Sequence, residues 1–249
     1  MIHTGASSHV TGSRALVLGL AERKKATGNT VHYIHVSSEV FGTQDSSNMV
    51  FKTGGISNLG DHPISGIYLE PRILSDKEDI YTYLKDRESK KVYQQRTTDV
   101  VVIETGLEGN VPTTILVSPT IYGVGTGLFN RTSVQAPTIL RAGIKDGQVS
   151  VIGDGNGVWD YVHVADLTDL YEIIIKRVLN GEEVPVGKSG IVFNGSGRYQ
   201  WKDLSASIAD ALFDAGAIKT KELKSITLEE AAQWVGGSTL IAELAYASK

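Results

Sequence analysis

Short apolar runs recur along the chain, and most are followed by a longer stretch in which apolar residues return every three or four positions. The first pattern is typical of strands and the second of amphipathic helices. Glycine closes the first helical stretch, where Gly28 follows residues 12–27. The expected strands lie at residues 2–4, 31–36, 113–117, 149–152, 161–164 and 191–194, and the expected helices at 12–27, 97–107, 132–142, 167–180, 201–212 and from 228.

Residues 149–181 show the clearest succession of elements. An apolar run ends at the turn Gly153-Asp154-Gly155, which needs backbone with positive φ, and the strand 161–164 follows. Asp166 occupies the position expected for the N-cap of the next helix. That helix presents one apolar stripe, made of Leu167, Leu170, Tyr171, Ile174 and Val178.

The last predicted helix, from Leu228, has Thr227 before it and Glu230 three positions after the threonine, which is the pattern of a capping box. Between residues 43 and 88 the periodicity fades, so we expect a long irregular excursion with one or two short helices. Alternation of strands with helices predicts an α/β fold with a doubly wound parallel sheet.

Composition narrows the function classes. The chain has 249 residues, 41% of them hydrophobic and 21% charged, with a formal net charge of −4 and no cysteine. The charge gives no reason to expect nucleic acid or an anionic membrane as a partner, and thiol catalysis is excluded. No apolar run has the length of a membrane span. We therefore expect a cytoplasmic protein that handles a small molecule.

Three motifs carry a resemblance to a known family. They are Ser118-Pro119-Thr120-Ile121-Tyr122-Gly123, the Gly153-Asp154-Gly155 turn with the strand and helix after it, and Ser37-Ser38-Glu39-Val40-Phe41-Gly42. In these positions the chain resembles the extended short-chain dehydrogenases/reductases, the NAD-dependent epimerase/dehydratase family. The resemblance implies a partial Rossmann-like core at residues 1–125 and 158–195, with a substrate-binding lobe at 126–157 and 196–249.

The resemblance also implies catalytic residues. A serine after the fifth strand of the family binds the substrate oxygen, which points to Ser38 or Ser37 here. The family's Tyr-x-x-x-Lys pair supplies the proton. Tyr81 and Lys85 have this spacing but lie far upstream of Pro119, so we expect them in a solvated loop. Tyr93 with Arg96 is the alternative, because an arginine can electrostatically favour a phenolate.

A dinucleotide cofactor, NAD or NADP, follows from the same resemblance. Backbone contacts to its nicotinamide end would come from Pro119, Ile121 and Tyr122, and Thr4-Gly5-Ala6 would lie beside the adenosine ribose. The sequence contains no Gly-x-Gly-x-x-Gly or Gly-x-x-Gly-x-x-Gly turn to hold the diphosphate. Residues 2–4 match the family's fourth strand, so we expect a natural short form or an incomplete gene product that lacks the glycine-rich part and a short C-terminal part.

Substrate contacts are expected from Trp159 and His163. Trp159 stands where nucleotide-sugar relatives carry an arginine for the phosphates, which favours an uncharged or aromatic small molecule over a nucleotide sugar. Packing of Trp159 within the lobe is the alternative. We expect no metal site, because His32 and His35 fall on opposite faces of one strand and cysteine is absent.

Three hypotheses about function stay open at this point. The first is an NAD(P)-dependent oxidoreductase or epimerase-like enzyme acting on a small non-nucleotide carbonyl or hydroxyl compound. The second is a cofactor-independent isomerase, cyclase or dehydratase on the same fold, and the third is a non-catalytic binding protein or degenerate family member. An uncovered sheet edge would also favour a homo-oligomer.

Overall fold

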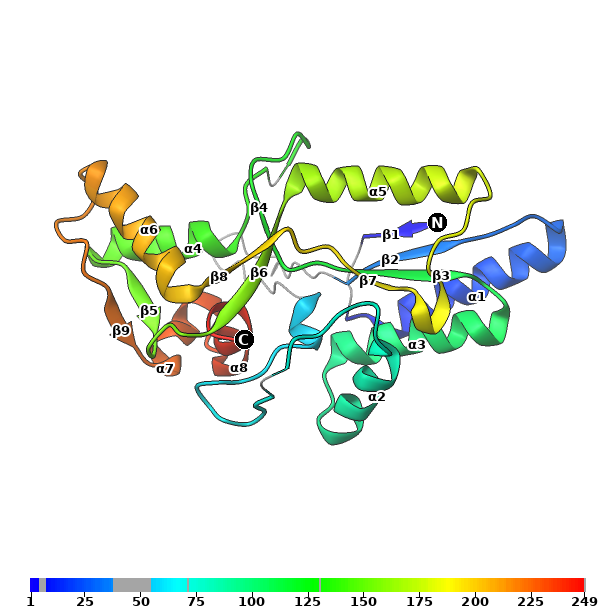
Figure 1. The fold of residues 1–249 in the computed structure, drawn as a ribbon, viewed down its shortest axis with the longest axis horizontal. Helices are drawn as coiled ribbons and strands as arrows, with labels where there is room; N and C mark the ends of the chain where they lie inside the picture. Colours follow the sequence, from blue (N-terminus) through cyan, green and yellow to red (C-terminus); the bar gives the residue numbers. More distant parts are fainter. Residues whose placement is uncertain (5–7, 38–54, 71, 130, 249) are drawn as a thin grey trace.

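The computed structural model describes residues 1–4, 8–37, 55–70, 72–129 and 131–248, and the fold below concerns these residues. Its centre is a four-stranded sheet with the order β1-β2-β3-β7, in which every pairing is parallel (Figure 1). The strands are β1 (Ile2–His3), β2 (Tyr33–Ser37), β3 (Thr113–Val117) and β7 (Ile191–Phe193).

Side chains alternate between the two faces of this sheet, and both faces are apolar, so helices cover both. Tyr33 and Ile115 face a core shared with α1 (Val10–Thr27) and α3 (Gln94–Gly109). Their neighbours Ile34 and Leu116 face α5 (Val164–Leu179), which presents the apolar stripe predicted from the sequence. Figure 1 shows α5 on one side of the sheet, with α1 and α3 on the other. The predicted α/β fold with a doubly wound parallel sheet is confirmed.

A second hydrophobic core lies at the other end of the molecule in Figure 1. It surrounds the buried Trp201 and includes Trp159, whose ring centroid lies 6.4 Å from that of Trp201. Strands β5 and β9 pair in parallel at this end. Its elements are α4 (Gln135–Asp146), β5 (Ser150–Ile152), α6 (Trp201–Asp214), β9 (Lys224–Ile226), α7 (Leu228–Ala232), η3 (Gln233–Val235) and α8 (Thr239–Tyr246).

A small mixed sheet lies between the two cores in Figure 1. Its central strand, β6 (Val158–His163), pairs in parallel with β4 (Thr120–Tyr122) and antiparallel with β8 (Gly197–Gln200). Strand β6 leads directly into α5, so the chain passes from the small sheet to the face of the central sheet without a loop.

Two local predictions, a turn and a capping box, are confirmed, and one predicted N-cap is wrong. Gly153 and Gly155 have φ of 59° and 66°, as the turn requires. Thr227 and Glu230 form the predicted capping box of α7. Asp166 is not the N-cap of α5; the helix begins two residues before it, and the imidazole of His163 accepts a hydrogen bond from the Ala165 amide instead. Asp166 lies in the first turn, where its charge suits the helix dipole.

The expectation that Tyr81 and Lys85 lie in a loop is wrong. Both belong to α2 (Ile80–Lys90), and the Glu104 carboxylate of α3 receives the Tyr81 hydroxyl at 2.9 Å and the Lys85 ammonium at 2.6 Å. The two residues therefore join α2 to α3. Short 3-10 turns, η1 (Ile56–Asn58) and η2 (Gly187–Ser189), complete the described elements.

Candidate active site

The carboxyl ends of the central strands lie together at one edge of the sheet. Ser37, Val117 and Phe193 end β2, β3 and β7 and are in register with one another. The amide of Ile56 donates to the carbonyl of Ser118 at 3.2 Å, which holds η1 at this edge. Helix α3 runs back to the start of β3, so its first turn also belongs to this edge.

Tyr93 is the N-cap residue of α3 and has extended backbone. Its hydroxyl lies 3.1 Å from the hydroxyl of Ser57 in η1 and 3.4 Å from Oε1 of Gln95. Ser57 and Gln95 are both buried. The Gln95 carboxamide oxygen accepts from both hydroxyls and orients them, and a phenol beside a second hydroxyl can exchange its proton, so the arrangement suits acid–base chemistry.

Arg96 is fixed one turn further along α3. Its Nε lies 3.0 Å from Oε2 of Glu88, and its two terminal nitrogens donate to the backbone carbonyls of Asn58 and Lys91. Burial lowers the pKa of this guanidinium and the Glu88 carboxylate opposes that shift; arginine stays charged at neutral pH in either case. Its Cζ lies 5.7 Å from the centre of the Tyr93 ring.

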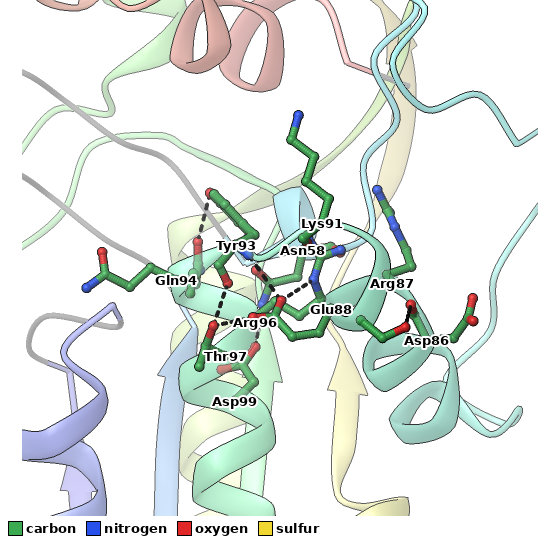
Figure 2. A network of polar contacts seen from close by, with 12 residues as sticks. Asn58, Asp86, Arg87, Glu88, Lys91, Tyr93, Gln94, Arg96, Thr97 and Asp99 are labelled. Carbon is green, nitrogen blue, oxygen red and sulfur yellow. Dashed lines mark hydrogen bonds and ion pairs between the residues drawn. The ribbon is translucent and has the colours of Figure 1, made fainter.

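Glu88 organises the start of α3 (Figure 2). Besides Arg96 it accepts a hydrogen bond from the Tyr93 amide at 3.1 Å and another from the Thr97 hydroxyl. These contacts connect α2 with α3 and hold the backbone of Tyr93 at the start of α3. Thr97, four residues after Tyr93, takes the position that the Tyr-x-x-x-Lys pattern gives to lysine.

A cavity of about 220 Å³ opens beside Tyr93. Its walls come from η1, from the loop after it, from the end of α2 and the start of α3, and from α8. The lining residues are Ser57, His62, Ile67, Tyr68, Arg87, Lys90, Lys91, Val92, Tyr93, Arg96, Leu240 and Leu244.

Helix α8 holds the loop wall of this cavity through Glu243. The carboxylate accepts hydrogen bonds from the amides of Ile64 and Ser65, and from the Ser65 hydroxyl. His62 Nδ1 lies 3.2 Å from the same carboxylate. Burial lowers the pKa of His62, whereas Glu243 raises it.

Several residues singled out from the sequence lie at the same edge, and others lie outside the described residues. Ser37 ends β2, and Thr4 is exposed just after β1. Ser38, Gly5 and Ala6 lie outside the described residues, so the structure gives them no place.

Two further candidates, Tyr122 and Trp159, line other cavities. Tyr122 lines one of about 410 Å³ with Tyr161 and Tyr199, and its ring meets that of His163 edge-on at 5.0 Å. Trp159 lines a cavity of about 310 Å³ and is also part of the second core. The structure therefore brings Tyr93 and Arg96 together in one cavity and places Tyr122 and Trp159 in two others.

Pro119 and Ile121 belong to the chain that leaves the central sheet. Pro119 lies between β3 and β4, and Ile121 is the middle residue of β4. Beside Pro119, Asn194 follows β7 and donates from Nδ2 to the Ser118 hydroxyl at 3.0 Å. The other amide atom of Asn194, Oδ1, is buried and has no hydrogen-bond partner among the described residues.

Sequence reasoning missed Ser57, Arg87 and Glu243 as parts of this region. Ser57 and Arg87 lie in or next to the stretch that lacked periodicity, and Glu243 is far away in the sequence. No sequence motif includes any of the three. Across the described residues, His, Asp and Glu side chains form no group of three or more that could hold a metal ion.

Comparison with known proteins identifies part of the chain. Residues 78–187 match the family model described as NAD dependent epimerase/dehydratase family. The likeness to that family is shown for this segment, which is less than half of the chain. It includes α2, α3 with Tyr93 and Arg96, β3 and β4, the small sheet's β6, and α5.

A curated relative extends the likeness beyond this segment. Oxidase ucsJ from Acremonium sp is 24% identical over 237 residues, which cover 91% of this chain and 62% of the relative. The chain therefore spans less than two thirds of that protein's length.

Solved structures that resemble this chain share less of its sequence. A dTDP-glucose 4,6-dehydratase from Bacillus anthracis in complex with NAD is 15% identical, with a TM-score of 0.49 over 91% of this chain and 59% of that one. A UDP-glucuronic acid 4-epimerase from Bacillus cereus in complex with NAD is 14% identical, with a TM-score of 0.48 over 98% of this chain and 72% of that one. Among the described helices, none is long and apolar enough to cross a membrane.

Proposed function

We propose that the protein is an NAD-dependent oxidoreductase or epimerase-like enzyme that acts on a small carbonyl or hydroxyl compound other than a nucleotide. The observation that carries this proposal is the Tyr93 hydroxyl, which lies 3.1 Å from Ser57 beside a cavity at the carboxyl edge of a parallel sheet. Ligands of open α/β sheets bind outside this edge. The family of residues 78–187 and the relative named as an oxidase both support redox chemistry.

In this proposal Tyr93 exchanges a proton with the substrate oxygen. Ser57 holds that oxygen or the phenol in place, because either hydroxyl can donate or accept. The Arg96 guanidinium near the ring favours the phenolate form electrostatically. General acid–base catalysis of this kind contributes about 10²- to 10⁴-fold to a rate.

NAD would supply the exchange of a hydride with the substrate carbon when bound. The unpartnered Oδ1 of Asn194 fits the nicotinamide end, because a buried acceptor at the carboxyl edge can receive the amide protons of a carboxamide. Pro119, Ile121 and Tyr122, with Thr4, Gly5 and Ala6 on the ribose side, are the further residues proposed to hold the cofactor. NADP in place of NAD is the alternative within this proposal.

A non-nucleotide substrate is supported by the size of the Tyr93 cavity. Clefts for drug-sized ligands start at about 300 Å³, and this cavity is about 220 Å³. We also propose that residues 126–157 and 196–249 form the substrate lobe, which the shared core around Trp201 supports. Trp159 and His163 do not line the Tyr93 cavity, so the proposal that they contact the substrate applies to a compound that extends beyond it, toward the border with the Rossmann-like part, residues 1–125 and 158–195.

Titration with NADH and NADPH, followed by fluorescence, tests the cofactor directly. Tyr93→Phe should leave the dissociation constant for the cofactor unchanged and lower turnover by at least about 100-fold. Tyr171→Phe is a matched control, because this tyrosine packs on α5 against the opposite face of the sheet. Absence of cofactor binding, or full turnover in Tyr93→Phe, would contradict the proposal.

A further inference from the structure

Arg87 is a buried cation at the end of α2. Its side chain is 5% exposed and lines the Tyr93 cavity. Nη2 donates to the carbonyl of Gly60 at 2.8 Å, and the guanidinium lies 3.9 Å above the ring of Tyr68. Nη1 is buried and has no hydrogen-bond partner among the described residues, and no carboxylate among them forms an ion pair with Arg87.

A buried charge in this state is costly. Buried guanidinium groups are normally paired with carboxylates or phosphates, since desolvation is compensated only by opposite charge and complete hydrogen bonding. A carbonyl and an aromatic face stabilise the cation in part. The N–H groups of Nη1 therefore have no acceptor among the described residues.

The cavity itself has the charge that such a partner needs. Its lining includes Arg87, Arg96, Lys90 and Lys91, and no Asp or Glu. Lys90 forms an ion pair with Asp86, and Arg96 forms one with Glu88. Arg87 interacts electrostatically with Glu70 without a direct ion pair, so Arg87 and Lys91 carry the positive charge of the lining that is not directly paired. Planar guanidinium is the group best suited to bind carboxylate or phosphate oxygens in pairs.

We propose that this cavity binds a small anionic compound and that Arg87 receives its carboxylate or phosphate group. The inference rests on the proposed function, in which the same cavity presents the Tyr93 hydroxyl to the reacting carbon–oxygen group. The substrate class is then a small hydroxy or oxo acid, or its phosphate counterpart. This replaces the uncharged substrate that Trp159 favoured in the sequence.

Equilibrium binding without cofactor tests this inference separately from catalysis. The probes are propanoate, inorganic phosphate and propanamide, titrated against the full chain at constant ionic strength and followed by thermal shift and calorimetry. We expect propanoate or phosphate to bind, and the neutral amide to bind at least about tenfold more weakly, because charge-assisted hydrogen bonds are lost. The preferred anion distinguishes a carboxylate from a phosphate substrate.

Arg87→Gln should raise the dissociation constant of the bound anion by about tenfold or more. Arg131→Gln is the control, because Arg131 also donates to a glycine carbonyl, that of Gly125, but lies outside the cavity. Equal binding of propanoate and propanamide, no binding of either anion, or unchanged affinity in Arg87→Gln would overturn the inference. If Arg87→Gln does not fold, the comparison of acid with amide on the unaltered chain decides. Anion binding without NADH binding would support the anion site and contradict the proposed function.

Discussion

The carboxylate of Glu243 accepts two hydrogen bonds from Ser65, one from the backbone amide at 2.8 Å and one from the hydroxyl at 2.7 Å, across a sequence separation of 178. The Ile64 amide donates to the same carboxylate at 2.9 Å. Glu243 is 2% exposed. One buried side chain of α8 thus satisfies two backbone amides of the loop that forms a wall of the Tyr93 cavity.

Replacement of Glu243 should therefore destabilise the fold. Glu243→Ala removes a buried carboxylate and leaves the part-buried amides of Ile64 and Ser65 without their acceptor, and we expect the free energy of unfolding to fall by about 2 kcal/mol. Urea unfolding measures the change. Glu172→Ala, which removes an exposed carboxylate paired with Lys176, is the control and should leave the midpoint unchanged. A midpoint in Glu243→Ala equal to that of the control would show that the loop is held by other contacts.

The fold should lose stability in acid because of His35. This side chain is fully buried, and burial lowers its pKa from 6.5 to about 3. The unfolded chain then binds one more proton between these values, so the free energy of unfolding falls with decreasing pH, by up to about 1.4 kcal/mol per unit from this group. Burial shifts the pKa of His3 and His32 in the same direction.

Urea unfolding between pH 7 and pH 4 measures this dependence, with both values chosen to bracket the imidazole's ordinary pKa of about 6.5. His35→Gln removes the titrating group and should flatten the dependence, whatever its effect on stability at neutral pH. An unchanged slope in the variant would mean that other groups cause the acid sensitivity.

Ser57 should affect catalysis more than cofactor binding. Ser57→Ala removes the hydroxyl beside Tyr93, and we expect turnover to fall by about tenfold, the equivalent of one hydrogen bond in the transition state. Steady-state kinetics and an NADH titration separate the two effects. Ser225→Ala, which removes a β9 hydroxyl that donates to the Gly153 carbonyl, is the control. Equal turnover in the two variants would exclude Ser57 from the mechanism.

Arg96 should not be replaceable by lysine. The guanidinium makes three directed contacts, to Glu88 and to the carbonyls of Asn58 and Lys91, and a single ammonium cannot reach all three. We expect Arg96→Lys to lower the free energy of unfolding by about 2 kcal/mol. Arg72→Lys at an exposed ion pair is the matched control and should have no measurable effect. Similar unfolding curves for both variants would contradict a positioning role for Arg96.

Local sequence patterns predicted the elements whose stability is local. The stripe from Leu167 to Val178 forms α5, and Thr227 with Glu230 caps α7, because both depend on neighbours within one or two turns. The prediction of Asp166 as the N-cap was wrong because the imidazole of His163 accepts the hydrogen bond instead. Histidine is not among the residues that N-cap preferences favour.

The candidate site could be predicted only in part. Tyr93 and Arg96 are neighbours in the sequence, so their spacing on α3 was visible. Ser38 or Ser37 was expected to bind the substrate oxygen, and Ser38 lies outside the described residues. No motif predicted that the Tyr93 hydroxyl would lie beside the hydroxyl of Ser57. Ser57 is held in this position by the backbone hydrogen bond from the Ile56 amide to the Ser118 carbonyl. This bond joins segments that are far apart in the sequence, so local periodicity could not predict it.

The contribution of Leu240 and Leu244 to the Tyr93 cavity has a thermodynamic consequence. A compound that binds in this cavity contacts α8 only while α8 is packed against the rest of the protein. Binding of the compound should therefore stabilise the packed position of α8, and packing of α8 should raise the affinity for the compound. Brief digestion by a protease that cleaves after lysine or aromatic residues, with and without a bound compound, would then report on ligand binding from the rate at which the carboxy-terminal tail is trimmed.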